Sequence, residues 1–194
     1  MEKKPERRIN AVKLISGLLS PEDGDLLRWA AERMTSAFGD IERESPPYPF
    51  DCTDYYRDIS PSLTRRFFTF AGLRHPFELA AWKKLAISIE AESARGRTCR
   101  SVNIDPGYID GARLVLASTK DNAHRIYIRD DIYAEVTLCH RKSGWESFSY
   151  TFPDFASGRY DAFLDTARGD WRAEMRVLRE NTAVIDHERK DCSL

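Results

Sequence analysis

Long apolar stretches are absent from this chain. No segment approaches the roughly 20 apolar residues that a membrane-spanning helix needs. The charged start, MEKKPERRIN, is followed by no apolar run of signal-peptide length. We therefore expect a cytoplasmic protein that makes no contact with a membrane.

Paired cysteines and an excess of basic charge are absent as well. The four cysteines are isolated, with no C-x-x-C pair, so we expect neither a structural zinc site nor a disulfide framework. The formal net charge of −1 argues against broad capture of DNA or RNA, which needs a basic face. A local basic cleft remains compatible with that charge. No residue is assigned as a metal ligand, and the sequence identifies neither a cofactor nor an oligomeric state.

Common enzyme motifs are also missing. The chain contains no G-x-S-x-G, no H-E-x-x-H, no G-x-G-x-x-G and no G-x-x-x-x-G-K-[ST]. These absences leave open whether the protein is an enzyme. They also mean that any site must be argued from clusters of polar residues.

Length and composition are those of an ordinary globular domain. The chain has 194 residues, of which 42% are hydrophobic and 31% charged. A chain of this length can bury a hydrophobic core without disulfide or metal cross-links. We expect a flexible segment at 1–10, a single α+β domain over 11–180 and a polar tail at 181–194.

The first half alternates segments of strand and helix character. The run AVKLISGLL (11–19) predicts a strand, and Ser20-Pro21 predicts the start of a helix that Gly39 ends. An aromatic strand, RRFFTF, precedes a second helix that opens at His75-Pro76. The expected order of strand, helix, strand, strand, helix and strand is that of a ferredoxin-like, split βαβ arrangement.

The second half predicts further strands and a final helix. The strands are expected near 99–104, 112–118, 124–129, 132–139 and 145–150, and the helix from about Ser157 past Trp171. Pro106-Gly107 is expected to form a turn after the first of them. Because the connections are too short for helical crossovers, the sheet should be mainly antiparallel.

The segment STKDNAHRIYIRDDIYAEV (118–136) predicts a hairpin. A three-residue loop, Arg129 to Asp131, keeps the aliphatic side chains on one face, and Asp131 would take the left-handed conformation. The pairs in this register are Ile128 with Ile132, Ile126 with Ala134, Tyr127 with Tyr133, and Arg125 with Glu135. We expect the two isoleucines Ile126 and Ile128 to be buried, and Arg125 and Glu135 to share the opposite face.

Polar residues cluster at several points along the sequence, and we select candidate site residues from these clusters. His124 is the best general-base candidate because it adjoins basic and acidic residues, and Asp105 or Asp54 could share proton transfer or hold a divalent metal. Arginine suits planar recognition of an anion. The residues assigned to ligand binding are Tyr55, Arg66, Asn103, Lys120, Arg125 and Glu135.

Each of these assignments has a structural alternative. An Arg125–Glu135 pair on a solvated strand face is worth only ~0.2–1 kcal/mol, and a lone histidine at a strand start is more often structural. We predict that the candidate residues converge on one pocket. The prediction has a geometric difficulty, because Asp105 precedes the expected Pro106-Gly107 turn whereas Lys120 follows the next strand and so falls at its other end.

Several long segments resemble one known family. They are KLISGLL, PFDCTDYYRD, LTRRFFTF, VNIDPGYIDGARLVLASTKDNAHRIYIRDDIYAEVTL and YTFPDF. Together they resemble the uncharacterised prokaryotic family called domain of unknown function 4416, over about residues 11 to 180. The resemblance implies no activity. The family pattern has DFTDYY and a glycine in the hairpin turn, where this chain has Cys52 and Asp130-Asp131, so Cys52 is a poor nucleophile candidate.

Two functions from different classes remain open. The first is binding of, or catalysis on, a small anionic ligand that is phosphorylated or nucleotide-like, through a pocket of basic, histidine and carboxylate side chains. The second is a noncatalytic protein-interaction module in which the same residues fix loops and edges.

Overall fold

The computed structural model describes residues 11–51, 59–94, 96 and 99–191. The strands are β1 (Val12–Ser20), β2 (Ile41–Glu44), β3 (Tyr48–Phe50), β4 (Leu63–Arg74), β5 (Asn103–Ile109), β6 (Arg113–Ser118), β7 (Ile126–Arg129), β8 (Ile132–Arg141) and β9 (Gly144–Ser147). The helices are α1 (Gly24–Phe38), the 3-10 turn η1 (Pro76–Glu78), α2 (Leu79–Ser93), α3 (Pro153–Ala156) and α4 (Asp161–Asp191).

The first half has the expected split βαβ arrangement. Its strands lie in the order β2-β4-β1-β5, so each βαβ unit has its two strands separated by a strand of the other unit. All of these pairs are antiparallel. β1 lies between β4 and β5 and is buried along its whole length.

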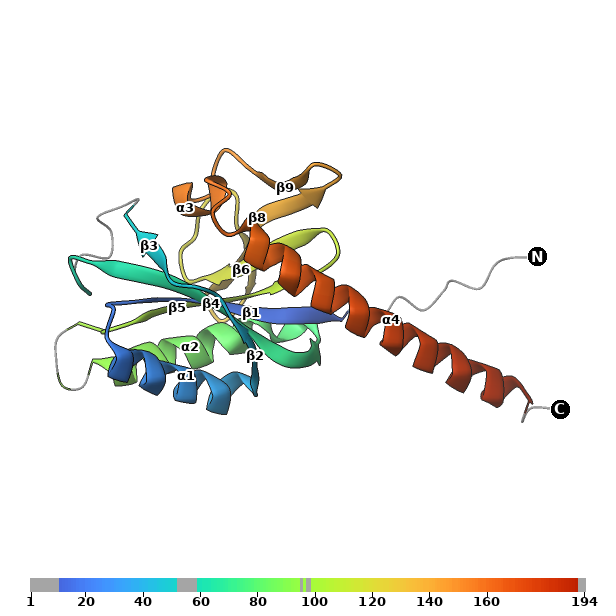
Figure 1. Cartoon of the computed structure of the whole chain (residues 1–194). Coiled ribbons are helices and arrows are strands. Elements are labelled where there is room, and N and C mark those ends of the chain that lie inside the picture. The colour runs from blue at the N-terminus through green and yellow to red at the C-terminus, as the bar shows by residue number, and fades with distance from the viewer. Residues whose placement is uncertain (1–10, 52–58, 95, 97–98, 192–194) are drawn as a thin grey trace.

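The second half extends the same sheet in the order β5-β6-β8-β7, with β9 also paired to β8. One core lies between the sheet and helices α1 and α2, and a second lies between the sheet and helices α3 and α4. Figure 1 shows the two pairs of helices on opposite faces. The expectation of a single α+β fold on a mainly antiparallel sheet is confirmed.

The start of α1 differs from the expectation. Asp23, and not Ser20, caps the helix, because its side chain accepts hydrogen bonds from the backbone N–H groups of Asp25 and Leu26 at 3.0 and 3.1 Å. Ser20 remains in β1, where it pairs with Thr64. Gly39 ends the helix as expected, with a positive φ of 97°.

Pro106-Gly107 is not a turn, so that prediction is wrong. β5 continues through both residues to Ile109, and the chain turns only at Asp110, whose carboxylate accepts the backbone N–H groups of Ala112 and Arg113. This later turn changes which residues lie at the same end of the sheet.

The hairpin between β7 and β8 differs from the expected one in its turn. The pairs Ile126–Ala134 and Tyr127–Tyr133 are as expected, but Ile128 forms a bulge and Arg129 pairs with Ile132. The turn therefore has two residues, Asp130 and Asp131, both left-handed with φ values of 55° and 58°.

Burial in this hairpin also departs from the expectation. Ile132 is buried, Ile128 is half-buried against the core, and Ile126 is 71% exposed. The physical reason is position, since β7 is the edge strand and α2 packs against β5, β6 and β8. The buried face of a strand needs a covering element, and the sequence pattern alone does not show where the helix stops.

The long helix α4 crosses the sheet and continues beyond it (Figure 1). Two contacts fasten it to β1 and the residue before it. The ammonium of Lys13, which is fully buried, contacts Glu174 of α4 and lies 2.7 Å from Glu42 of β2. The indole of Trp171 donates a hydrogen bond to the carbonyl of Ala11 at 2.8 Å. Among the described residues, no helix is both long and apolar enough to cross a membrane.

Candidate functional site

A cavity of about 610 Å³ lies where the sheet opens between β5 and β6. These strands pair over only three residue pairs, from Gly107–Leu116 to Ile109–Leu114, and diverge before Gly107. The cavity is lined both by α2, under the sheet, and by Phe155 of α3, on the opposite face. It therefore passes through the gap between the two strands.

The opening has a local cause in the sequence Pro106-Gly107. Backbone groups of successive strand residues point to alternate sides, so the Pro106 nitrogen faces the same side as the Ile104 N–H, away from β1. Proline has no N–H to offer a neighbouring strand there. At Gly107 the two strands come very close, because an added Cβ would lie 2.2 Å from the carbonyl oxygen of Val115. Close approach at Gly107 and a missing donor at Pro106 mark the point where β6 separates from β5.

Side chains of α2 take the place of β6 along the exposed edge of β5. A carboxylate oxygen of Glu90 accepts the backbone N–H of Ile104 at 2.7 Å, and the Lys83 ammonium donates to the Ile104 carbonyl at 2.8 Å. Without them, two buried backbone groups would lose their partners, at about 1–3 kcal/mol each. Lys83 and Glu90 thus form one wall of the cavity.

Asp105 projects from the same part of β5. Its carboxylate accepts a hydrogen bond from Asn103 at 2.8 Å and lies 3.4 Å from Lys83 and 3.7 Å from Arg65. Burial alone would raise the pKa of this carboxyl, but the two positive charges and the hydrogen bonds outweigh it, so the pKa of Asp105 is lowered. The pKa of Glu90, by contrast, is raised because its burial outweighs the nearby Lys83 and Arg100 charges.

Arg65 reaches this wall from β4 by crossing β1. It passes over Gly17, where an added Cβ would lie only 3.0 Å from its guanidinium. Asp154 lies 3.0 Å from the Arg65 Nε and accepts a hydrogen bond from the Tyr160 hydroxyl at 2.8 Å. Three aromatic rings surround the guanidinium at 5.0–5.9 Å, those of Phe50, Phe67 and Phe155.

The loop between β6 and β7 forms the opposite wall and is folded around Arg125. The guanidinium of Arg125 donates through Nε to Glu135 at 2.8 Å and through Nη1 to the Ser118 hydroxyl at 2.8 Å and the Lys120 carbonyl at 3.0 Å. Arg125 therefore holds residues 118–120 against β8. Much of its hydrogen-bonding capacity is used within the loop itself.

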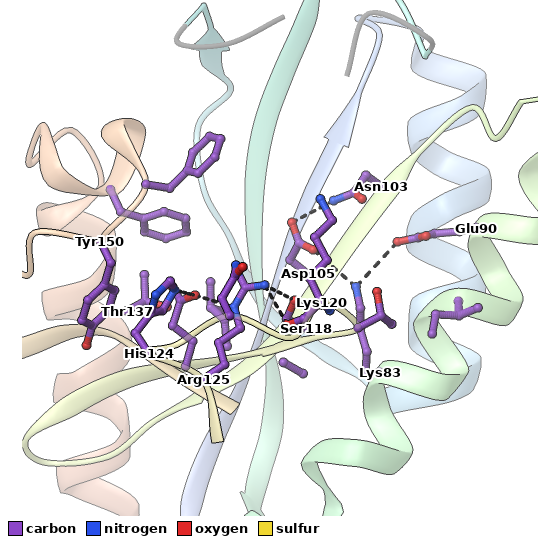
Figure 2. A pocket seen from close by; sticks show the side chains of 18 of the residues that line it. Lys83, Glu90, Asn103, Asp105, Ser118, Lys120, His124, Arg125, Thr137 and Tyr150 are labelled. Atoms are coloured by element: carbon purple, nitrogen blue, oxygen red, sulfur yellow. Dashed lines mark hydrogen bonds and ion pairs between the residues drawn. The ribbon is translucent and has the colours of Figure 1, made fainter. Parts of the chain in front are cut away.

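His124 completes this wall. Its Nε2 lies 3.1 Å from the Glu135 carboxylate, and its ring stacks on Tyr150 with centroids 4.2 Å apart and planes 6° apart. Glu135 is buried and thus orients both His124 and Arg125. In Figure 2, Tyr150, Thr137 and His124 lie on one side of the pocket and Glu90, Lys83 and Asn103 on the other.

The structure brings most of the selected residues around this one cavity. Those that line it are Asn103, Asp105, Lys120, His124, Arg125 and Glu135. The geometric difficulty disappears because β5 turns only after Ile109. Asp105 therefore lies at the same end of the sheet as Ser118, the last residue of β6.

One selected residue lies away from the cavity, and two others fall outside the described residues. Arg66 points away from it and pairs with Glu44 at 2.9 Å, whereas its neighbour Arg65 lines it. The alternation of side chains along β4 allows only one of the two to face the site, and the sequence did not show which. Asp54 and Tyr55 lie outside the described residues.

The lining residues that the sequence reasoning missed include Lys83, Glu90, Ser118 and Tyr150. A signal existed for the first two. Lys83 and Glu90 are seven residues apart, within the otherwise apolar face that α2 buries. Charged residues are rarely buried without a partner, so their position on that face pointed to a polar interior.

Metal binding gains no geometric support in the described part of the chain. Those residues contain no group of three or more His, Cys, Asp or Glu side chains placed to hold a metal ion.

Comparison with known proteins assigns the chain to a family of unknown activity. No curated protein and no solved structure matches it. The profile of the family described as domain of unknown function DUF4416 matches residues 10–171, which include all the described residues that line the cavity. The chain therefore belongs to the DUF4416 family.

Proposed function

We propose that this protein binds a small anionic ligand, phosphorylated or nucleotide-like, in the cavity between β5 and β6. The observation that carries the proposal is the charge of the lining. Among the described residues that line the cavity, five are basic and three are acidic, although the whole chain has a net charge of −1. A lining with excess positive charge attracts anions, and the volume falls in the range of ligand sites, roughly 300–1,000 Å³.

The cavity has a wall formed by β5 with side chains from α2 and β4, called the β5 wall, and an opposite wall formed by the β6–β7 loop and β8, called the loop wall. The excess positive charge is concentrated on the loop wall. On the β5 wall, three cations face three carboxylates once the buried Asp154 beside Arg65 is included. These groups are Arg65, Lys83 and Arg100 with Glu90, Asp105 and Asp154. On the loop wall, the charged side chains among the described lining residues are those of Lys120, Arg125 and Glu135, so cations outnumber carboxylates there. The anionic group of the ligand therefore belongs beside Lys120.

Ligand screening with a charge variant tests the proposal. Phosphorylated metabolites are screened by thermal shift, because a ligand that binds only the folded state at 100 times its Kd adds about 2.7 kcal/mol to stability. Lys120→Gln should weaken binding of the best hit about tenfold. Lys142→Gln removes an exposed lysine in the β8–β9 turn, away from the cavity, and should leave binding unchanged.

Two results would overturn the proposal. One is that no phosphorylated compound at millimolar concentration raises the melting temperature. The other is that Lys120→Gln and Lys142→Gln have the same effect on the affinity of the hit, which would mean that the anion lies elsewhere.

A further inference from the structure

We infer that the ligand is a phosphorylated sugar or similar polyol, whose phosphate contacts the loop wall and whose hydroxyl groups contact the β5 wall. The inference rests on the proposed function and goes further, because it states what the second half of the ligand is. It follows from the different hydrogen-bonding groups that the two walls offer.

The loop wall offers donors. The Ser118 hydroxyl oxygen accepts two hydrogen bonds, from the Lys120 backbone N–H at 3.1 Å and from Arg125 at 2.8 Å. A hydroxyl has two acceptor lone pairs and one proton, so this oxygen has only its proton left to give. Among the described residues, no acceptor takes that proton, and Ser118 lines the cavity. The Ser118 O–H and the Lys120 ammonium together suit a phosphate oxygen.

The β5 wall offers acceptors instead. Asn103 donates through its amide nitrogen to Asp105, and within the described structure its side-chain oxygen accepts no hydrogen bond. Beside it stands the Asp105 carboxylate, which Lys83 and Arg65 keep ionised. A second anionic group placed here would meet a negative charge. Sugar hydroxyls suit this wall, because they donate to carboxylate and amide oxygens without adding charge.

The apolar lining is consistent with such a ligand. Ile87 of α2 and Phe152 before α3 are each 38% exposed and both line the cavity. A sugar ring presents C–H groups on its faces, which can pack on such side chains. The cavity volume of about 610 Å³ also leaves room for more than a single phosphate group.

Three probes separate the two halves of the ligand. Inorganic phosphate, ribose and ribose 5-phosphate are titrated into the full chain by calorimetry. Ribose 5-phosphate should bind at least ten times more tightly than either phosphate or ribose. Lys120→Gln should weaken the binding of phosphate and ribose 5-phosphate alike.

A variant of the β5 wall tests the hydroxyl contacts directly. Asn103→Ala should weaken ribose 5-phosphate about tenfold and leave inorganic phosphate unchanged, while Asn181→Ala on the exposed part of α4 should change neither. Circular dichroism checks that Asn103→Ala folds. If it does not fold, the comparison of the three probes on the unmodified chain still decides.

The outcomes distinguish this inference from the proposed function. Equal affinities for phosphate and ribose 5-phosphate overturn the inference and leave anion binding standing. Ribose binding as tightly as ribose 5-phosphate overturns both, because the phosphate would then contribute nothing. Absence of binding by phosphate and by ribose 5-phosphate at millimolar concentration likewise overturns both.

Discussion

Asp105 is the residue at which three elements of the first half of the chain meet at the site. It lies on β5 but contacts Lys83 from α2 and Arg65 from β4, so three elements depend on its negative charge. Because both cations are more than nine-tenths buried, loss of that charge leaves them poorly compensated. The carboxylate therefore contributes to stability as well as to the proposed ligand site.

The stability effect of Asp105 should depend on pH. Asp105→Asn should lower the free energy of unfolding by about 1–3 kcal/mol at pH 7. The folded-state pKa of Asp105 is lowered, so its contribution is complete above the unfolded pKa of about 3.9 and is lost as the pH falls through the folded value. Urea unfolding from pH 7 to pH 2.5 measures the difference, which should shrink below pH 4.

A surface carboxylate provides the control for that experiment. Asp25 is 87% exposed, and Asp25→Asn should change stability by less than about 0.5 kcal/mol at any of these pH values. A difference between wild type and Asp105→Asn that stays constant down to pH 2.5 would show that the charge of Asp105 is not what stabilises the fold.

At the scale of single elements, the β7–β8 hairpin shows a backbone constraint that its sequence meets only in part. Both turn residues adopt the left-handed conformation, which is unfavourable by roughly 1–2 kcal/mol for most residues. Asp130 is tied to Lys84 of α2 at 2.9 Å, whereas Asp131 pairs with no basic side chain in the described structure. Asp131 is therefore the position where a glycine relieves strain without removing an ion pair.

We expect Asp131→Gly to stabilise the protein by ~0.5–1 kcal/mol, because glycine adopts this conformation freely and suits the second position of such turns. Thermal and urea unfolding measure the gain. Asp131→Ala is the matched variant, and it should destabilise, since alanine shares the steric restriction of aspartate without its local hydrogen bonding. Equal stability of the glycine and alanine variants would contradict this explanation.

Elements were predictable from the sequence where local pattern and tertiary position agree. The order β1-α1-β2-β4-α2-β5 and two cross-strand pairs of the hairpin were expected, because apolar periodicity and short connections determine them. The predicted turn at Pro106 was wrong because an interior strand tolerates a proline where the neighbouring strand has separated from it, and the sequence does not show that separation. Ile126 was misjudged because its exposure depends on where α2 ends.

For the candidate site, the sequence anticipated which residues lie together when they are close in the chain, and it missed those brought in from a distance. The loop residues Lys120, His124 and Arg125 form a bunch in the sequence, and Asp105 follows from strand alternation. Lys83 approaches through the gap in the sheet, which no local pattern reveals. The choice between Arg65 and Arg66 needed the register of β4 against its neighbours.

At the scale of the whole molecule, α4 is held to the sheet by a buried charge. Lys13 is completely buried in β1, yet its two partners, Glu42 and Glu174, are 31% and 28% exposed. The carboxylates can therefore be hydrated without Lys13, whereas Lys13 has no access to water. Removing the lysine charge and removing the two carboxylate charges should therefore change the free energy of unfolding by different amounts.

Replacing Lys13 and neutralising its two carboxylate partners should have different effects on stability. Lys13→Met keeps the length and apolar stem of the side chain, and we expect it to change stability by less than about 1 kcal/mol. The double variant Glu42→Gln with Glu174→Gln leaves the buried ammonium uncompensated and should cost about 3 kcal/mol. Urea unfolding compares them. A larger loss for Lys13→Met than for the double variant would show that the lysine is needed for its charge.

The short pairing between β5 and β6 has a mechanical consequence. Only three residue pairs join the five strands β1 to β5 to the four strands β6 to β9. The hydrogen-bonded connection of the sheet is therefore narrowest between β5 and β6, where α2 also packs across the line against β5, β6 and β8. The cavity lies on that line, so its width depends on how the two parts of the sheet are held relative to each other. A molecule that touched both walls would bridge the two parts of the sheet and hold them at a fixed separation.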